Sequence, residues 1–264
     1  MSRWVVGIAC IILALAGLTW LLVGWQAGAK AQSGDAVWYE QVTADDPEMS
    51  RLLKEAQKYN QTHPFNPKDG AGDKEYQEQL SKPDGIMASV DYPRLGIRLA
   101  VRHGTTADVL SSGAGHLPGT SLPVGGKGTR TVITGHRGGT TPLFTRLGEA
   151  RKGDVFHITA AGRTLAYRVV GIQVIQPDDM QALAPQKDKD LATLLTCTPY
   201  GVNTERLLVT GVRTRMPGWT ERPTDKSIPT MQFILAGLWS VGITTSLIGA
   251  WQWKRDRKKQ VHSC

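Results

Sequence analysis

Few residues in this sequence are cysteine, and several patterns that mark common protein classes are absent. The formal net charge is +8, but the basic residues form no stripe and no aromatic-rich RNA motif accompanies them, which argues against nucleic-acid binding. No cluster of His, Cys and carboxylate residues has the spacing of metal ligands, so we expect no metal and no other cofactor. No internal repeat and no phosphate-binding glycine loop is present.

Charged residues are missing from two long apolar segments, residues 4–25 and residues 231–253. Each segment is long enough to cross a hydrocarbon core of about 30 Å as a helix, so we predict two transmembrane helices. For the first segment a cleaved signal peptide remains the alternative, because Ala27-Gly28-Ala29 resembles a cleavage site.

The basic residues beside these segments predict the topology. The tail at residues 254–264 is basic and directly follows the second apolar segment, and Arg3 precedes the first. Positive residues next to a membrane span tend to stay in the cytoplasm. We therefore expect a protein of the cell membrane, with both termini in the cytoplasm and one domain outside the cell.

The three cysteines differ in their expected surroundings. Cys10 lies in the first apolar segment and Cys264 lies in the basic tail, so Cys197 alone belongs to the external domain. External cysteines usually pair, because that compartment is oxidising. A single external cysteine is either a buried, inert thiol or a reactive one, and the count by itself leaves both possibilities open.

The chain between the two spans falls into two parts. Residues 34–85 are polar and predict two short helices that flank a turn-rich break at His63-Pro64-Phe65. Residues 86–215 hold short runs rich in β-branched residues, bounded by Gly and Pro, which indicate a mainly β barrel or sandwich with few and short helices. The expected strands are 87–90, 97–101, 131–134, 155–159, 164–176, 192–197 and 205–212.

Three side chains of the β-rich part are suited to chemistry. One predicted strand runs into glycine and His136, another ends on Cys197, and Arg206 opens the strand after that. Cys197 and Arg206 are separated by a turn that contains Pro and Gly. If the two strands are adjacent, the thiol and the guanidinium come together at one rim.

Cysteine, histidine and arginine together match the needs of acyl transfer. A thiolate is the attacking species, and a nearby positive charge favours it. An imidazole can take up and return protons during the reaction. A guanidinium stays charged and can donate hydrogen bonds to the oxyanion of a tetrahedral intermediate.

The motifs around these residues resemble those of a known family. Thr193-Leu194-Leu195-Thr196-Cys197 resembles the TLxTC signature of the sortases, Gly135-His136-Arg137-Gly138 is similar to their histidine segment, and Arg206 lies where they have an arginine. Over roughly residues 86–213 the sequence most resembles class C, the pilin-polymerising sortases. The resemblance implies an eight-stranded β-barrel in which His136, Cys197 and Arg206 are catalytic.

The resemblance also implies a lid over the active site. Class C sortases usually carry an Asp-Pro-aromatic motif whose aspartate pairs with the catalytic arginine and whose ring covers the thiol. The matching region here is His63-Pro64-Phe65, so Phe65 can still cover Cys197, whereas His63 cannot supply the anion. Thr196 is predicted to line the substrate groove; the alternative is a residue that merely favours a strand.

For function, the resemblance implies cleavage of an LPxTG-like sorting signal through a thioacyl-enzyme and transfer of the acyl group to an amine. The expected partners are protein substrates with such signals, above all pilin subunits, and the membrane. Three alternatives remain: a housekeeping sortase that joins surface proteins to peptidoglycan, a wall-active cysteine hydrolase, and a non-catalytic surface module.

Overall fold

The structure, a computed structural model, describes residues 3–66, 74–138, 143–216 and 239. The chain divides into two compact units, residues 1–26 with 223–264 and residues 27–222. Helix α1 (Arg3–Thr43) begins in the first unit and ends in the second. Among the described residues we find no helix with the length and apolar content that crossing a membrane requires. The predicted span at 231–253, apart from residue 239, and the tail at 254–264 lie outside the described residues.

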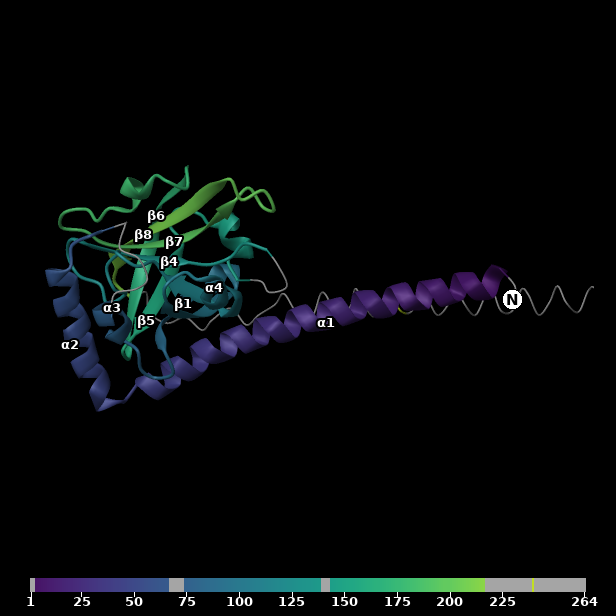
Figure 1. The fold of residues 1–264 in the computed structure, drawn as a ribbon, viewed down its shortest axis with the longest axis horizontal. Coiled ribbons are helices and arrows are strands. Elements are labelled where there is room, and N and C mark those ends of the chain that lie inside the picture. The colour runs from purple at the N-terminus through teal and green to yellow at the C-terminus, as the bar shows by residue number, and fades with distance from the viewer. Residues whose placement is uncertain (1–2, 67–73, 139–142, 217–238, 240–264) are drawn as a thin grey trace, which may run out of the picture. The chain divides into compact units, whose positions relative to one another are not determined.

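The second unit is built on a closed barrel of eight strands, in the order β1-β2-β3-β4-β7-β8-β6-β5 (Figure 1). Two neighbouring pairs, β2 with β3 and β4 with β7, are parallel, and the other pairs are antiparallel. This architecture confirms the predicted mainly β barrel. The strands are β1 Ile86–Tyr92, β2 Ile97–His103, β3 Ala114–His116, β4 Thr129–Thr134, β5 Val155–Ala160, β6 Arg163–Ile175, β7 Asp190–Thr198 and β8 Glu205–Thr214.

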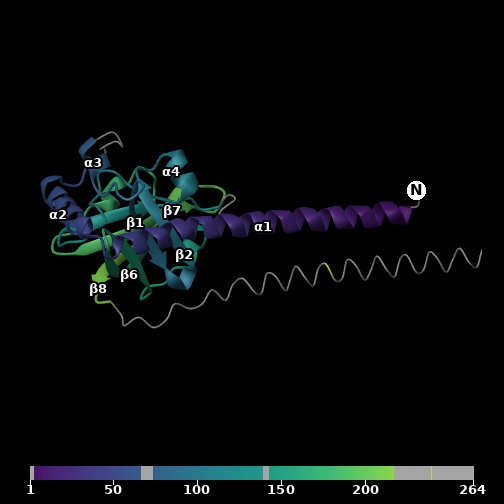
Figure 2. The ribbon, with the colours of Figure 1, turned by 90° about the horizontal axis from the view of Figure 1, so that it is seen from below.

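Short helices surround the barrel, and α2 and α3 lie near one another beside it (Figures 1 and 2). Helix α2 begins after Asp46, whose side chain accepts a hydrogen bond of 2.8 Å from the backbone N–H of Glu48, and Pro47 occupies its first turn. The remaining elements are α2 Pro47–Thr62, α3 Lys74–Glu78, α4 Ala107–Ser112 and the 3₁₀ turns η1 Pro93–Leu95, η2 Thr145–Glu149 and η3 Met180–Leu183.

The C-terminal end of α1 packs onto the barrel. The hydroxyl of Tyr39 donates to the carbonyl oxygen of Met87 and accepts from the N–H of Ala161, both at 3.0 Å. Glu40 forms an ion pair with Arg98. Residues 34–43 therefore belong to α1, and the two short helices predicted on either side of the break at His63-Pro64-Phe65 are the separate elements α2 and α3.

Aromatic rings fill much of the barrel interior. The rings of Tyr92, Phe156 and Tyr167 follow one another at centroid distances of 5.8 and 5.7 Å, and all three side chains are fully buried. Alternation of such residues with polar ones along each strand is what places them inside a closed sheet. The interior is thus a packed core, and chemistry has to occur at its rims or outer faces.

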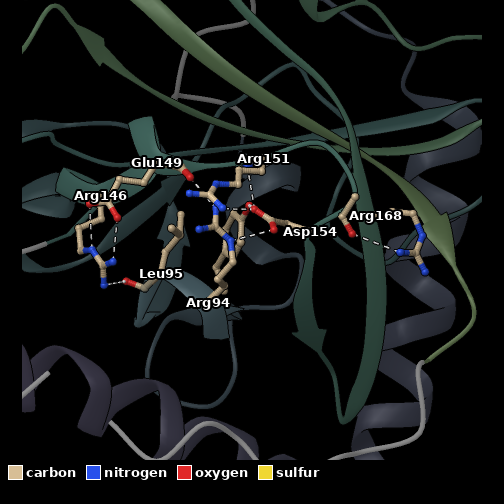
Figure 3. A network of polar contacts seen from close by, with 9 residues as sticks. Arg94, Leu95, Arg146, Glu149, Arg151, Asp154 and Arg168 are labelled. Atoms are coloured by element: carbon tan, nitrogen blue, oxygen red, sulfur yellow. Dashed lines mark hydrogen bonds and ion pairs between the residues drawn. The ribbon is translucent and has the colours of Figure 1, made fainter. Parts of the chain in front are cut away.

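One end of the barrel is fastened by a network around Asp154 (Figure 3). The carboxylate accepts two hydrogen bonds from Arg94, at 2.8 and 2.6 Å, one from the Tyr92 hydroxyl at 2.6 Å and one from the Arg151 N–H at 2.8 Å. Arg94 also donates to the carbonyl oxygen of Glu149 at 2.5 Å. The network ties η1 to the loop that leads into β5.

The Asp154 network predicts a pH-dependent contribution to stability. Burial alone would raise the pKa of Asp154, but hydrogen bonds from Arg94, Tyr92 and the Arg151 N–H outweigh it, so the pKa lies below its usual value. A carboxylate with a lowered pKa stabilises the fold above the unfolded-state pKa of about 3.9, and this contribution is lost as the pH falls through the folded-state value.

We therefore expect Asp154→Asn to lower the free energy of unfolding by about 1–3 kcal/mol near pH 7. When urea unfolding is repeated at lower pH, the deficit relative to wild type should stay nearly constant down to about pH 5 and should shrink as the pH falls through and below about 4. Asp178→Asn, which changes an exposed carboxylate, serves as the matched control and should have little effect. A deficit for Asp154→Asn that stays constant from pH 7 down to about pH 3 would contradict this assignment.

Candidate active site

Cys197 and Arg206 face each other on neighbouring strands. They are direct partners in the antiparallel register of β7 with β8, and such partners project from the same face of a sheet. The strands are joined by a turn in which the N–H groups of Val202 and Asn203 both donate to the carbonyl oxygen of Pro199, at 3.1 and 3.0 Å. Cys197 is a free, partly buried thiol. The turn thus places a thiol and a permanent cation side by side at one rim.

His136 reaches the same rim from the other side of β7. Strands β4 and β7 are parallel, with Thr134 opposite Leu195. His136 and Cys197 each follow two residues later, so equal lengths of chain bring them to the same end of the barrel. The exposed His136 is held through its backbone, because its carbonyl oxygen accepts a hydrogen bond of 3.0 Å from the N–H of Phe144.

Of the three candidate catalytic residues, Cys197 lies on β7, Arg206 lies on the neighbouring β8, and His136 follows the end of β4 on the other side of β7. Arg206 is partly buried, and its Nη1 donates to the carbonyl oxygens of Asn203 and Glu205 at 3.2 and 3.1 Å. Both contacts go to neighbouring backbone. A guanidinium has five N–H donors in all, so this arrangement leaves further donors for a substrate oxygen.

Thr196 has a different position from the one that the sequence predicts. Its side chain is fully buried, and its hydroxyl donates to the carbonyl oxygen of Gly135 at 2.7 Å. Alternation along β7 directs it to the opposite face from Cys197. Thr196 therefore fastens the backbone just before His136 to β7, and in this structure its side chain does not line a surface groove.

Arg137 and Tyr200 join the two loops that carry the candidate histidine and cysteine. Nη1 of Arg137 donates to the hydroxyl of Thr198 at 3.0 Å. The ring of Tyr200 packs against Gly138, where an added Cβ would lie 3.0 Å from the Tyr200 hydroxyl oxygen. The sequence does not predict these contacts. It shows only that Arg137 directly follows His136 and that Tyr200 lies three residues after Cys197.

Phe65 lies against the outer face of the strands that carry the site. It packs on a buried apolar cluster that includes Val132 of β4, Leu195 of β7 and Leu208 of β8. Leu195 precedes Cys197 by two residues, so both side chains project from the same face of β7. The segment is anchored next to Phe65, where the N–H of Asn66 donates to the carbonyl oxygen of Gly119 at 2.9 Å.

His63, which precedes Pro64, contacts both α2 and α3. The His63 ring stacks on that of Tyr59 at a centroid distance of 3.9 Å, and its Nε2 lies 3.6 Å from a carboxylate oxygen of Glu75. These contacts are local to the helices. His63 thus contacts Tyr59 and Glu75, whereas the resemblance to class C implies an aspartate at this position that pairs with the arginine of the active site.

The part of the chain that the structure describes contains no group of three or more His, Cys, Asp or Glu residues able to hold a metal ion. The side chains at the rim are a thiol, an imidazole and a guanidinium.

Comparisons with known proteins point to one family. The sortase domain model matches residues 90–214. The chain is similar to the crystal structure of sortase C-1 from Actinomyces oris, with 39% identity and a TM-score of 0.60, covering 64% of this chain and 99% of that one. It is also similar to a pilus-related sortase C of Group B Streptococcus, with 38% identity and a TM-score of 0.63, covering 67% and 96%. Sortase D of Bacillus subtilis is 28% identical over 157 residues, which are 56% of this chain and 77% of that protein.

Proposed function

Because the chain belongs to the sortase family and is a cysteine transpeptidase, we propose that it cleaves an LPxTG-like sorting signal and transfers the acyl group to a lysine of a pilin subunit. The observation that carries this proposal is the register that pairs Cys197 with Arg206 and brings His136 to the same rim. The pilus-related sortase among its structural relatives supports the choice of acceptor.

In the first half of the proposed reaction, the thiolate of Cys197 attacks the carbonyl carbon of the scissile Thr–Gly bond. Arg206 donates hydrogen bonds to the oxyanion of the tetrahedral intermediate, where negative charge develops. His136 gives a proton to the departing glycine nitrogen. The C–N bond breaks, and a thioester joins the substrate's threonine to Cys197.

In the second half, the amine of the incoming lysine attacks the thioester carbonyl carbon. His136 accepts a proton from this amine, and Arg206 again donates to the oxyanion. The C–S bond breaks, an isopeptide bond forms, and Cys197 leaves as the thiolate. The enzyme returns to its starting state.

We further propose that the protein is anchored in the cell membrane, with the catalytic barrel outside the cell and both termini in the cytoplasm. The proposal rests on the two uncharged segments and the basic tail of the sequence. We also propose that Phe65 acts as part of a lid, and its packing on the face of β7 that carries Cys197 supports this role.

Product analysis tests the proposed transfer. The full chain is incubated with a sorting-signal peptide, alone and with a lysine-containing pilin peptide, and the products are identified by mass spectrometry. We expect cleavage after threonine and an isopeptide product whose yield rises with the concentration of the lysine peptide. Matched reactions contain the same peptide with lysine replaced by arginine, or an amine that mimics the peptidoglycan cross-bridge. Release to water alone, or transfer to the cross-bridge mimic in preference to lysine, would contradict the proposal.

A further inference from the structure

A cavity of about 440 Å³ lies at the end of the barrel opposite the candidate catalytic residues. Its walls include Gly126 and Lys127, which precede β4, and Asp190, the first residue of β7. Cys197 lies seven residues further along β7, which corresponds to about 23 Å at the rise of a strand. The cavity is therefore separate from the site that would bind a sorting signal.

Four cationic side chains line this cavity from different elements. Lys127 comes from the loop before β4, Arg163 from the start of β6, Lys189 from the loop before β7 and Arg213 from the end of β8. Within the described ranges none of the four forms an ion pair. Positive charge therefore reaches this one space from several sides, and no ion pair with a carboxylate among the described residues neutralises it.

The two acidic residues of the lining do not cancel this charge. Asp190 is engaged in building the wall, because its carboxylate accepts hydrogen bonds of 3.0 Å from both the Tyr167 hydroxyl and the Gly126 N–H. An added Cβ at the neighbouring Gly125 would lie 2.8 Å from the same carboxylate. Asp188 is exposed to solvent, as Lys127, Arg163 and Lys189 are, so screening weakens the influence of all four side chains alike. Four cations against two carboxylates leave an excess of positive charge.

Arg213 supplies an independent indication of a ligand. Its guanidinium carbon lies 5.8 Å from the centroid of the Tyr167 ring, which fixes the side chain over that face. Its Nη1 is buried and has no hydrogen-bond partner among the described residues. A buried charged donor without an acceptor is costly, so an oxygen ligand that enters the cavity would relieve this cost.

We propose that this cavity binds a phosphate group. Arginine is well suited to phosphate, because its N–H donors match two oxygens at once. Cations that approach from several elements match a tetrahedral group, whose oxygens point in different directions, better than a planar carboxylate with two oxygens. The phosphate belongs either to a phosphodiester polymer or to a free phosphate ion, and the sites at the two ends of the barrel act on different molecules.

Calorimetric titration of the full chain in detergent, at low ionic strength, tests the proposal with inorganic phosphate, a short glycerol-phosphate polymer and acetate. We expect saturable binding of phosphate that weakens as salt is added. Arg213→Gln and Arg163→Gln should each weaken it about tenfold, because each removes a charged donor. Binding of the polymer as well as of free phosphate would identify a phosphodiester as the ligand, and binding of free phosphate alone would identify the ion; both results support the site.

Arg168→Gln is the matched control, because Arg168 is an exposed arginine of β6 like Arg163, but it donates to the carbonyl oxygen of Gly153 at 3.2 Å and does not line the cavity. It should leave phosphate binding unchanged. All three variants should keep their thermal unfolding midpoint near that of wild type and should still cleave a sorting-signal peptide. Absence of saturable binding, an equal loss in Arg168→Gln, or acetate bound as tightly as phosphate would each overturn the proposal.

Discussion

Replacement of Cys197 by alanine is expected to lower the rate of sorting-signal cleavage by at least about a thousandfold, because removal of a covalent nucleophile leaves only binding and electrostatic contributions. Cys10 lies in α1 and Cys264 in the basic tail, so residues 86–214 of the barrel hold no second cysteine that could replace Cys197. The measurement is the release of the C-terminal fragment from a labelled peptide. Thermal unfolding of the variant should be close to that of wild type, because the substitution removes one partly buried sulfur atom.

The other two cysteines of the sequence provide matched controls for this variant. Cys10→Ala and Cys264→Ala make the same chemical change outside the barrel and should retain cleavage at the wild-type rate. Cleavage by Cys197→Ala within about tenfold of wild type, well short of the loss that follows removal of a nucleophile, would show that a different group attacks the substrate.

Replacement of Arg206 by alanine is expected to lower kcat/KM by about a hundredfold to a thousandfold, the usual loss when a donor to the oxyanion is removed. The register places Arg206 directly opposite Cys197, so no neighbouring arginine can take over without a change in the pairing of β7 with β8. Arg206→Lys should restore only part of the rate, because an ammonium lacks the planar pair of donors.

Arg168→Ala is the matched control for Arg206, since it removes an exposed arginine from a strand of the same barrel. It should leave kcat/KM close to the wild-type value. If Arg206→Ala had no larger effect than Arg168→Ala, the proposed role for Arg206 in stabilising the oxyanion would be wrong. Full recovery with Arg206→Lys would indicate that charge alone, without the bidentate geometry, is what the reaction needs.

Much of the barrel follows from local sequence patterns. The predicted strand at 192–197 lies within β7, and the predicted strand at 205–212 lies within β8, because β-branched and apolar residues bounded by Pro and Gly are a strong local signal. The short separation between them also predicts an antiparallel pair. That pairing is sufficient to bring Cys197 opposite Arg206.

Other features depend on contacts between distant parts of the chain. Strand β3 contains only Ala114–His116, which is too short for any periodic pattern to reveal. The parallel pairing of β4 with β7 joins segments about sixty residues apart, and no turn between them sets its register. The closed barrel, and not the local sequence, therefore brings His136 and Cys197 to the same end of the sheet.

Side-chain contacts around the site also depend on the fold and cannot be predicted from the local sequence. The burial of Thr196 follows from its place on the inner face of β7, and its hydrogen bond to Gly135 requires the neighbouring β4. The bond from Arg137 to Thr198 likewise joins two loops that only the fold brings together. A motif identifies which residues are present, whereas these bonds determine how firmly the candidate histidine and cysteine are held relative to each other.

Intact-protein mass spectrometry during turnover of a sorting-signal peptide tests the proposed mechanism most directly. Without an acceptor amine, we expect the full chain to gain the mass of the peptide fragment that ends in threonine, attached to Cys197 as a thioester that hydroxylamine removes. Cleavage that proceeds with no adduct on Cys197, or with the fragment attached to another residue, would contradict the account.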